Sequence, residues 1–95
     1  MEISLEALRC PDATRMMRRA IDQFLETDDN VLKLSTIEPS MERNIKAFIG
    51  MESLPVSFTS SARPITEDDQ RAWLEHFDEE DFEDVSTINT FTIQR

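Results

Sequence analysis

Residues 8 to 19 read Leu-Arg-Cys-Pro-Asp-Ala-Thr-Arg-Met-Met-Arg-Arg, and they place the only cysteine of the chain at the start of a strongly patterned helix. Apolar residues recur at helical spacing along one stripe: Ala13, Met16, Met17, Ala20, Ile21, Phe24 and Leu25. This 3.6-residue period predicts an amphipathic helix whose stripe, both methionines included, faces the core. Pro11 suits the first helical position, where a missing N–H costs nothing, so Cys10 is predicted to be the N-cap.

Cys10 is the candidate for chemistry. At a helix N-terminus the unpaired backbone N–H groups and the macrodipole stabilise a thiolate, and Arg9 and Arg15 would add positive charge. Such a thiolate is nucleophilic near neutral pH. A lone cysteine can equally be a small buried hydrophobic residue without reactivity, and the position of Cys10 alone leaves both interpretations open.

Length and composition limit the classes of protein to consider. The chain has 95 residues, enough for one domain with a single core. It lacks both an apolar stretch of membrane-spanning length and a signal-peptide pattern, so we expect a soluble cytoplasmic protein. One cysteine allows no internal disulfide, one histidine (His76) gives no zinc-ligand pattern, and one glycine (Gly50) gives no phosphate-binding loop. We expect no metal and no cofactor, and a monomer or a weak dimer.

The net charge of −10 is concentrated in one segment, because residues 67–84 contain ten acidic residues and one arginine. Binding of DNA or RNA needs clustered positive charge, so direct contact with nucleic acid is not expected. The exception is an arginine face on the first helix, formed by Arg15, Arg18 and Arg19. A solvated face with an Arg18–Asp22 pair is the simpler interpretation of its far end.

The remaining elements follow from alternation and from turn signals. Strands are predicted over residues 2–7, leading directly to Cys10, and over 31–36, 54–58 and 87–95. A second helix is predicted to begin at Glu38-Pro39-Ser40 and to end in a left-handed cap at Gly50. This order predicts an α/β (α+β) two-layer sandwich, a single domain over 1–95 in which two helices cover one face of a four-stranded mixed sheet in βαβαββ order.

Residues 66–84 interrupt this alternation as an acidic excursion before the last strand. Thr66 and Asp69 form a capping-box pattern that starts a helix over about 66–77, with Trp73 and Phe77 packed inward. Residues 78–84 are expected to be a solvated, mobile acidic loop. We expect the excursion to lie outside the core, so that deleting residues 67–84 spares the fold.

Two parts of the chain resemble the TusA/SirA-like sulfur-carrier family. The matching residues are Leu8-Arg9-Cys10-Pro11 at a strand-to-helix junction, Arg18 and Arg19 on the helix, and Glu38-Pro39 followed by Arg43 and Ile45. The similarity covers residues 3 to 60 and, more loosely, the last strand. Ala13 stands where the second proline of the family's Cys-Pro-x-Pro motif would be.

The resemblance implies a function centred on Cys10. This residue would carry sulfur as a persulfide, loaded by a cysteine desulfurase and passed to a sulfur-acceptor protein, and no cofactor would be needed. Partners would bind a surface formed by Arg9, Pro11, Arg15, Arg18 and Arg19.

Two other functions fit the sequence. One is a non-catalytic interaction module of the same fold, whose acidic segment binds a basic partner. The other is a thiol redox sensor, which would need an intermolecular partner because the chain has no resolving cysteine.

Overall fold

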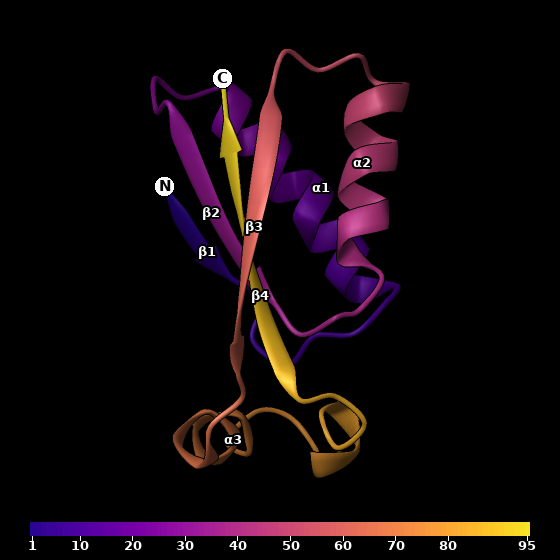
Figure 1. Cartoon of the computed structure of the whole chain (residues 1–95), viewed down its shortest axis with the longest axis vertical. Coiled ribbons are helices and arrows are strands. Elements are labelled where there is room, and N and C mark those ends of the chain that lie inside the picture. The colour runs from indigo at the N-terminus through magenta and orange to yellow at the C-terminus, as the bar shows by residue number, and fades with distance from the viewer.

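The computed structural model describes residues 1–95 and has a four-stranded mixed sheet with three helices, an α+β fold (Figure 1). Along the chain the elements are β1 (Glu2–Ser4), α1 (Asp12–Leu25), β2 (Val31–Thr36), α2 (Met41–Met51), β3 (Ser57–Pro64), α3 (Glu67–Trp73), the 3₁₀ turn η1 (Glu79–Asp81) and β4 (Thr87–Gln94). No helix combines the length and the apolar character needed to cross a membrane.

The sheet is open and has the strand order β1-β2-β4-β3. β1 pairs with β2 in parallel, and β4 lies between β2 and β3, antiparallel to both. The last strand therefore occupies the centre of the sheet, and β1 and β3 form its two edges.

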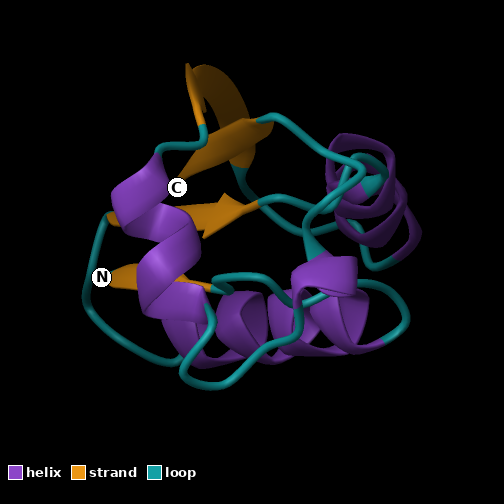
Figure 2. Ribbon diagram, turned by 90° about the horizontal axis from the view of Figure 1, so that it is seen from below, coloured by secondary structure: helices purple, strands orange, loops and turns teal.

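Helices α1 and α2 cover one face of this sheet, as the sequence predicts (Figures 1 and 2). Buried side chains of both helices share a single core cluster with Leu32, Leu34, Phe91 and Ile93, which face the same way from β2 and β4. The residues that directly follow these four along β2 and β4 lie on the opposite face of the sheet and are polar. Among them, Ser35 is hydrogen-bonded to Thr90 at 3.0 Å. Because that face is polar, it needs no covering layer.

The predicted stripe of α1 is buried except near its margins. Ala13, Met17, Ala20, Ile21 and Phe24 are buried. Met16 is 39% exposed, so its assignment to the core is wrong. The helix also begins one residue later than predicted, at Asp12, with Pro11 rather than Cys10 as the N-cap residue.

Three element boundaries differ from the sequence prediction. The first strand ends at Ser4, because Glu6 adopts a left-handed conformation (φ 51°) that turns the chain before Cys10. Gly50 does not end α2 in a left-handed cap: it lies inside the helix, and the left-handed residue is Ser53 (φ 49°). β3 begins later than expected and continues to Pro64.

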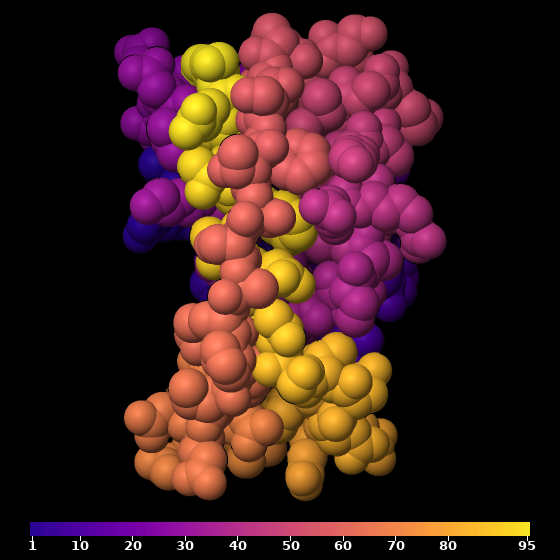
Figure 3. Space-filling model, viewed as in Figure 1, coloured from indigo at the N-terminus to yellow at the C-terminus, as the bar shows by residue number.

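The acidic excursion folds into a cap, here called the acidic cap (residues 66–84), at one end of the molecule (Figures 1 and 3). The predicted capping box is present: Thr66 Oγ1 accepts the Asp69 N–H at 3.2 Å, and the Asp69 carboxylate accepts the Thr66 N–H at 2.9 Å. Helix α3 ends at Trp73, four residues earlier than expected.

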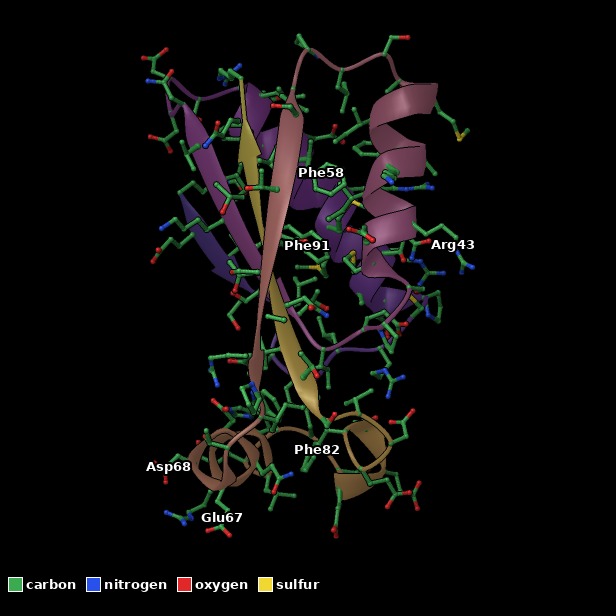
Figure 4. The ribbon with its side chains drawn as sticks, viewed as in Figure 1. Arg43, Phe58, Glu67, Asp68, Phe82 and Phe91 are labelled. Atoms are coloured by element: carbon green, nitrogen blue, oxygen red, sulfur yellow. The ribbon has the colours of Figure 1, made fainter.

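Part of the acidic cap belongs to the core, contrary to expectation. Trp73 is buried as predicted, and Phe82, in the stretch expected to be a solvated loop, is also buried. Both pack in a second cluster with Ala7, Ile37 and Ile88 of the body. Figure 4 shows Phe82 directed into the molecule, while Glu67 and Asp68 point outward. The aromatic side chains anchor the cap, and the carboxylates cover its outside.

Candidate functional site

Cys10 lies on the surface, in the turn that leads into α1. Three side-chain groups surround its sulfur. Sγ is 2.9 Å from Thr14 Oγ1, 3.6 Å from Ser40 Oγ and 3.7 Å from Asn44 Nδ2. Thr14 lies one turn along α1, whereas Ser40 and Asn44 come from the start of α2, so the two helix beginnings together build the site.

The hydrogen bonds within this cluster leave one close donor for the sulfur. Asn44 Nδ2 donates to Thr14 Oγ1 at 2.9 Å and to Ser40 Oγ at 3.1 Å. The Ser40 hydroxyl donates to Glu38 Oε2 at 2.9 Å, so its single proton is already used. The Thr14 hydroxyl proton is free to point at Sγ. A thiolate at Cys10 therefore has one short hydrogen bond, from Thr14, and a longer contact with the Asn44 amide.

Glu38 holds the backbone of the cysteine turn in place. Its carboxylate is buried, with the residue 8% exposed, and accepts the Cys10 N–H at 3.0 Å, the Ser40 N–H at 3.1 Å and Arg9 Nε at 3.2 Å. Burial alone would raise the pKa of this carboxyl, but the hydrogen bonds from Cys10, Ser40 and Arg9 outweigh it and lower the pKa to about 2. Glu38 is thus ionised at neutral pH and fixes the position of the Cys10 main chain.

Arg9 joins the cysteine turn to the acidic cap. Besides Glu38, its guanidinium binds both carboxylate oxygens of Asp84, at 2.6 and 3.2 Å, and the carbonyl oxygen of Asp81 at 2.9 Å. The hydrogen bonds that Arg9 donates to Asp84 raise the pKa of Arg9, although partial burial opposes the shift. The side chain is only 26% exposed. Arg9, predicted as a partner-binding residue, has its donors engaged within the chain.

The other predicted partner-binding residues lie on the exposed side of α1 and its start. Pro11 is exposed, and the Arg15 side chain is 73% exposed with a 3.5 Å contact to Asp12. Arg18 lies over the Phe48 ring, 5.5 Å from its centroid, and no ion pair joins it to Asp22. Arg19 lines a surface hollow of about 330 Å³ together with Leu8, Asp12, Arg15 and Met16.

A second hollow, of about 350 Å³, is lined by Cys10 and lies where the body meets the acidic cap. The hollow also includes Arg9, Phe77 and Asp81. The two hollows share Leu8 and Asp12, so the surface beside Cys10 continues onto the arginine face. No group of three or more His, Cys, Asp or Glu side chains is arranged to hold a metal ion.

Sequence reasoning singled out Cys10 but missed the residues that surround it. Thr14 could have been found from its spacing, because position i+4 lies over position i on a helix. Ser40 and Asn44 have the same spacing, but nothing in the sequence states that the two helices begin side by side. The sequence places Glu38 at a helix start and in the family resemblance, but it does not show that its carboxylate is buried against a backbone turn 28 residues away in the chain.

The arrangement can hold an anionic sulfur at an exposed position, with a hydroxyl donor close by and a fixed main chain. The side-chain groups around the sulfur are two hydroxyls and an amide, so the nucleophile of the site is the sulfur itself. Comparison with known proteins adds no family assignment: no protein-family model, no curated protein and no solved structure matches this chain.

Proposed function

We propose that this protein is a sulfur carrier that relays sulfane sulfur as a persulfide on Cys10. The observation that supports this proposal is an exposed sulfur 2.9 Å from the Thr14 hydroxyl, with the Asn44 amide at 3.7 Å. The resemblance of the Leu8-Arg9-Cys10-Pro11 stretch to sulfur carriers points the same way.

The chemistry needs two exchanges and no cofactor. The Cys10 thiolate attacks the outer sulfur of a persulfide on a cysteine desulfurase, forming a new S–S bond while the desulfurase cysteine leaves as a thiolate. A thiolate of the acceptor protein then attacks the outer sulfur on Cys10. The second exchange transfers that sulfur and returns Cys10 to the thiolate, so no electrons are gained or lost overall.

The surrounding residues fit this role as stabilisers rather than as acids or bases. Hydrogen bonds to an ionised group are stronger than those between neutral groups, so the Thr14 hydroxyl favours the anionic sulfur. Glu38 keeps the Cys10 main chain in place through the hydrogen bond at 3.0 Å. Arg15 and Arg19, exposed beside the site, provide a positive surface for acidic residues of the donor or acceptor.

Loading by a desulfurase tests the proposal. Incubated with a cysteine desulfurase and cysteine, the wild-type protein should gain the mass of one sulfur atom, which a reductant removes. Cys10→Ser should fold normally and gain nothing, because a hydroxyl cannot carry sulfane sulfur. Wild-type protein that stays unloaded with several desulfurases would count against sulfur carriage.

The Thr14 hydrogen bond can be tested separately. Thr14→Val removes the hydroxyl at almost constant volume and should slow loading about tenfold, since a hydrogen bond to a charged group contributes about 1.5 kcal/mol or more. Thr92→Val, on the polar face of the sheet, is the matched control and should load at the wild-type rate. Equal rates for both variants would remove Thr14 from the mechanism.

A second function is supported by the acidic cap. Carboxylates of the cap, including those of Glu67 and Asp68, form an outward-facing acidic surface (Figure 4). Buried aromatic side chains anchor this surface to the body. Such a surface suits a basic protein partner. In that case Cys10→Ser should bind the partner as the wild type does, whereas replacing Glu67, Asp68, Glu79 and Glu80 by glutamine should weaken a salt-sensitive association.

A further inference from the structure

β3 is a long edge strand without the usual protection against pairing. It has eight residues, and all of them except Phe58 are exposed. Edge strands are commonly blocked by charges, prolines or short length. Here residues 57–62 contain no charge and no proline, and the blocking residues Arg63 and Pro64 stand only at the end.

The hydrogen-bond register shows which backbone groups of β3 are free. Ile65 N–H donates to Ser86 O at 2.9 Å, which makes Ile65 and Ser86 a hydrogen-bonded pair continuing the β3–β4 register. Because such pairs alternate along an antiparallel ladder, residues 57, 59, 61 and 63 bond to β4. Phe58, Ser60 and Ala62 therefore direct their N–H and C=O groups outward, at the free edge.

A groove runs along this edge, between β3 and α2. It has a volume of about 480 Å³ and is lined by Ile49 and Gly50 of α2, by residues 56–60, and by Glu42 and Lys46. Figure 3 shows β3 running along the front of the molecule with α2 beside it, and Figure 4 shows Phe58 on the side of the sheet that faces α2. The groove thus combines the unpaired edge of β3, apolar side chains and two charged side chains.

We infer that a second copy of this chain binds here, with the two β3 strands pairing antiparallel about a two-fold axis near Ser60. In this register Phe58 of each copy pairs with Ala62 of the other. Ser60 pairs with Ser60 of the second copy. The ladder forms about six hydrogen bonds. A large side chain lies beside a small one at both ends, and Arg63 faces Ser57 of the second copy rather than another arginine.

The charges of the groove are self-complementary in this arrangement. Glu42 and Lys46 form no ion pair within the chain and stand one helical turn apart. A two-fold interface brings residue i against j and j against i. With the α2 helices antiparallel, Glu42 of each copy faces Lys46 of the other. The same symmetry places the two acidic caps at opposite ends of the dimer, farther apart than the Debye length of about 8 Å at physiological salt.

The contact is small, because β3 and the α2 side of the groove bury less than the ~800 Å² per partner that is typical of stable complexes. Association is therefore weak and depends on concentration. Sedimentation equilibrium from about 5 to 500 µM, with reductant present to exclude a Cys10 disulfide, should show the average mass rising from monomer toward dimer. A monomer throughout this range overturns the inference.

Four single variants and one double variant test the geometry. Ser60→Pro removes an outward N–H without removing a bond to β4 and should raise the dissociation constant at least about tenfold, whereas Ser60→Ala, which keeps the N–H, should not. Glu42→Lys and Lys46→Glu should each weaken the dimer several-fold, and the double swap should restore it.

Glu42→Lys is the most discriminating variant, because it changes the net charge from −10 to −8. General repulsion between acidic chains predicts stronger association for this variant, whereas the proposed interface predicts weaker association. If Ser60→Pro and Glu42→Lys both dimerise with the wild-type dissociation constant, the contact lies elsewhere and the inference is overturned. If Ser60→Pro fails to fold, as judged by circular dichroism, the charge variants and their double swap decide alone.

Discussion

Replacing Glu38 by glutamine should both weaken the fold and remove part of its sensitivity to acid. The carboxylate accepts hydrogen bonds from Cys10, Ser40 and Arg9 while almost fully buried. Glutamine has nearly the same shape but no charge, and its NH₂ group would face donors. Hydrogen bonds to charged groups contribute about 1.5 to 3 kcal/mol each, and the energies are not additive, so we expect a loss of about 2 to 3 kcal/mol at pH 7.

The pH dependence follows from the pKa of this residue, which lies at about 2 in the folded protein against an ordinary value of 4.5. Because the unfolded chain binds the proton more tightly, the stability from ionised Glu38 is complete above pH 4.5 and is lost as the pH falls toward 2. At 1.36 kcal/mol for each pKa unit, the difference between the pKa of Glu38 in the unfolded and folded protein corresponds to about 3 kcal/mol of stability.

Urea unfolding followed by circular dichroism between pH 2 and 7 measures both effects. At pH 7 the free energy of unfolding of Glu38→Gln should be lower than that of the wild type by about 2 to 3 kcal/mol. The difference in stability between wild type and variant should shrink as the pH is lowered below 4.5, because the wild type loses what the variant already lacks. A difference that stays constant down to pH 2 would refute the assignment of acid sensitivity to Glu38.

Three further variants test other parts of the structure. Arg9→Met removes the bidentate pair with Asp84 and should increase amide hydrogen exchange across residues 78–85, whereas Arg15→Met, at an exposed position, should not. Phe82→Ala should cost about 3 to 4 kcal/mol in urea unfolding, because the ring is 2% exposed; a cost below about 1 kcal/mol would show that the cap is not part of the core. Gly50→Ala should raise the free energy of unfolding by about 0.5 to 1 kcal/mol, because Gly50 lies inside α2 and an added Cβ meets nothing within 4 Å; a decrease would contradict this placement.

The layer architecture could be predicted from the sequence because it depends on periodicity. The stripe from Ala13 to Phe24 and the alternation of Leu32 with Leu34 each identify a buried face without knowledge of the rest of the chain. Two such helices between alternating strands leave few arrangements, and placing both on one face was correct.

The errors arose where tertiary contacts decide the local structure. Gly50 carries the expected signal for a helix end, yet the helix continues past it and the left-handed turn falls at Ser53. Phe82 stands among acidic residues that predict a solvated loop, but the second cluster buries its ring. A pattern cannot show which single aromatic residue in a charged stretch has a partner elsewhere.

The candidate site was predictable only in part, for the same reason. Pro11 and the stripe identified Cys10 as the residue at a helix start, and the structure places its sulfur on the surface. Its neighbours Ser40 and Asn44, and the carboxylate of Glu38, come from a segment about 30 residues away. Only the packing of α1 against α2 brings these groups together.

Locating the transferred sulfur tests sulfur carriage most directly. The protein is mixed with a desulfurase and sulfur-labelled cysteine, alkylated without reductant and digested, and the mass of the peptide containing Cys10 is measured. We expect one labelled sulfur per chain on that peptide, its release when an acceptor thiol is added, and no label in Cys10→Ser. Absence of label on a Cys10 that still reacts with the alkylating reagent would contradict sulfur carriage and favour the interaction module built on the acidic cap.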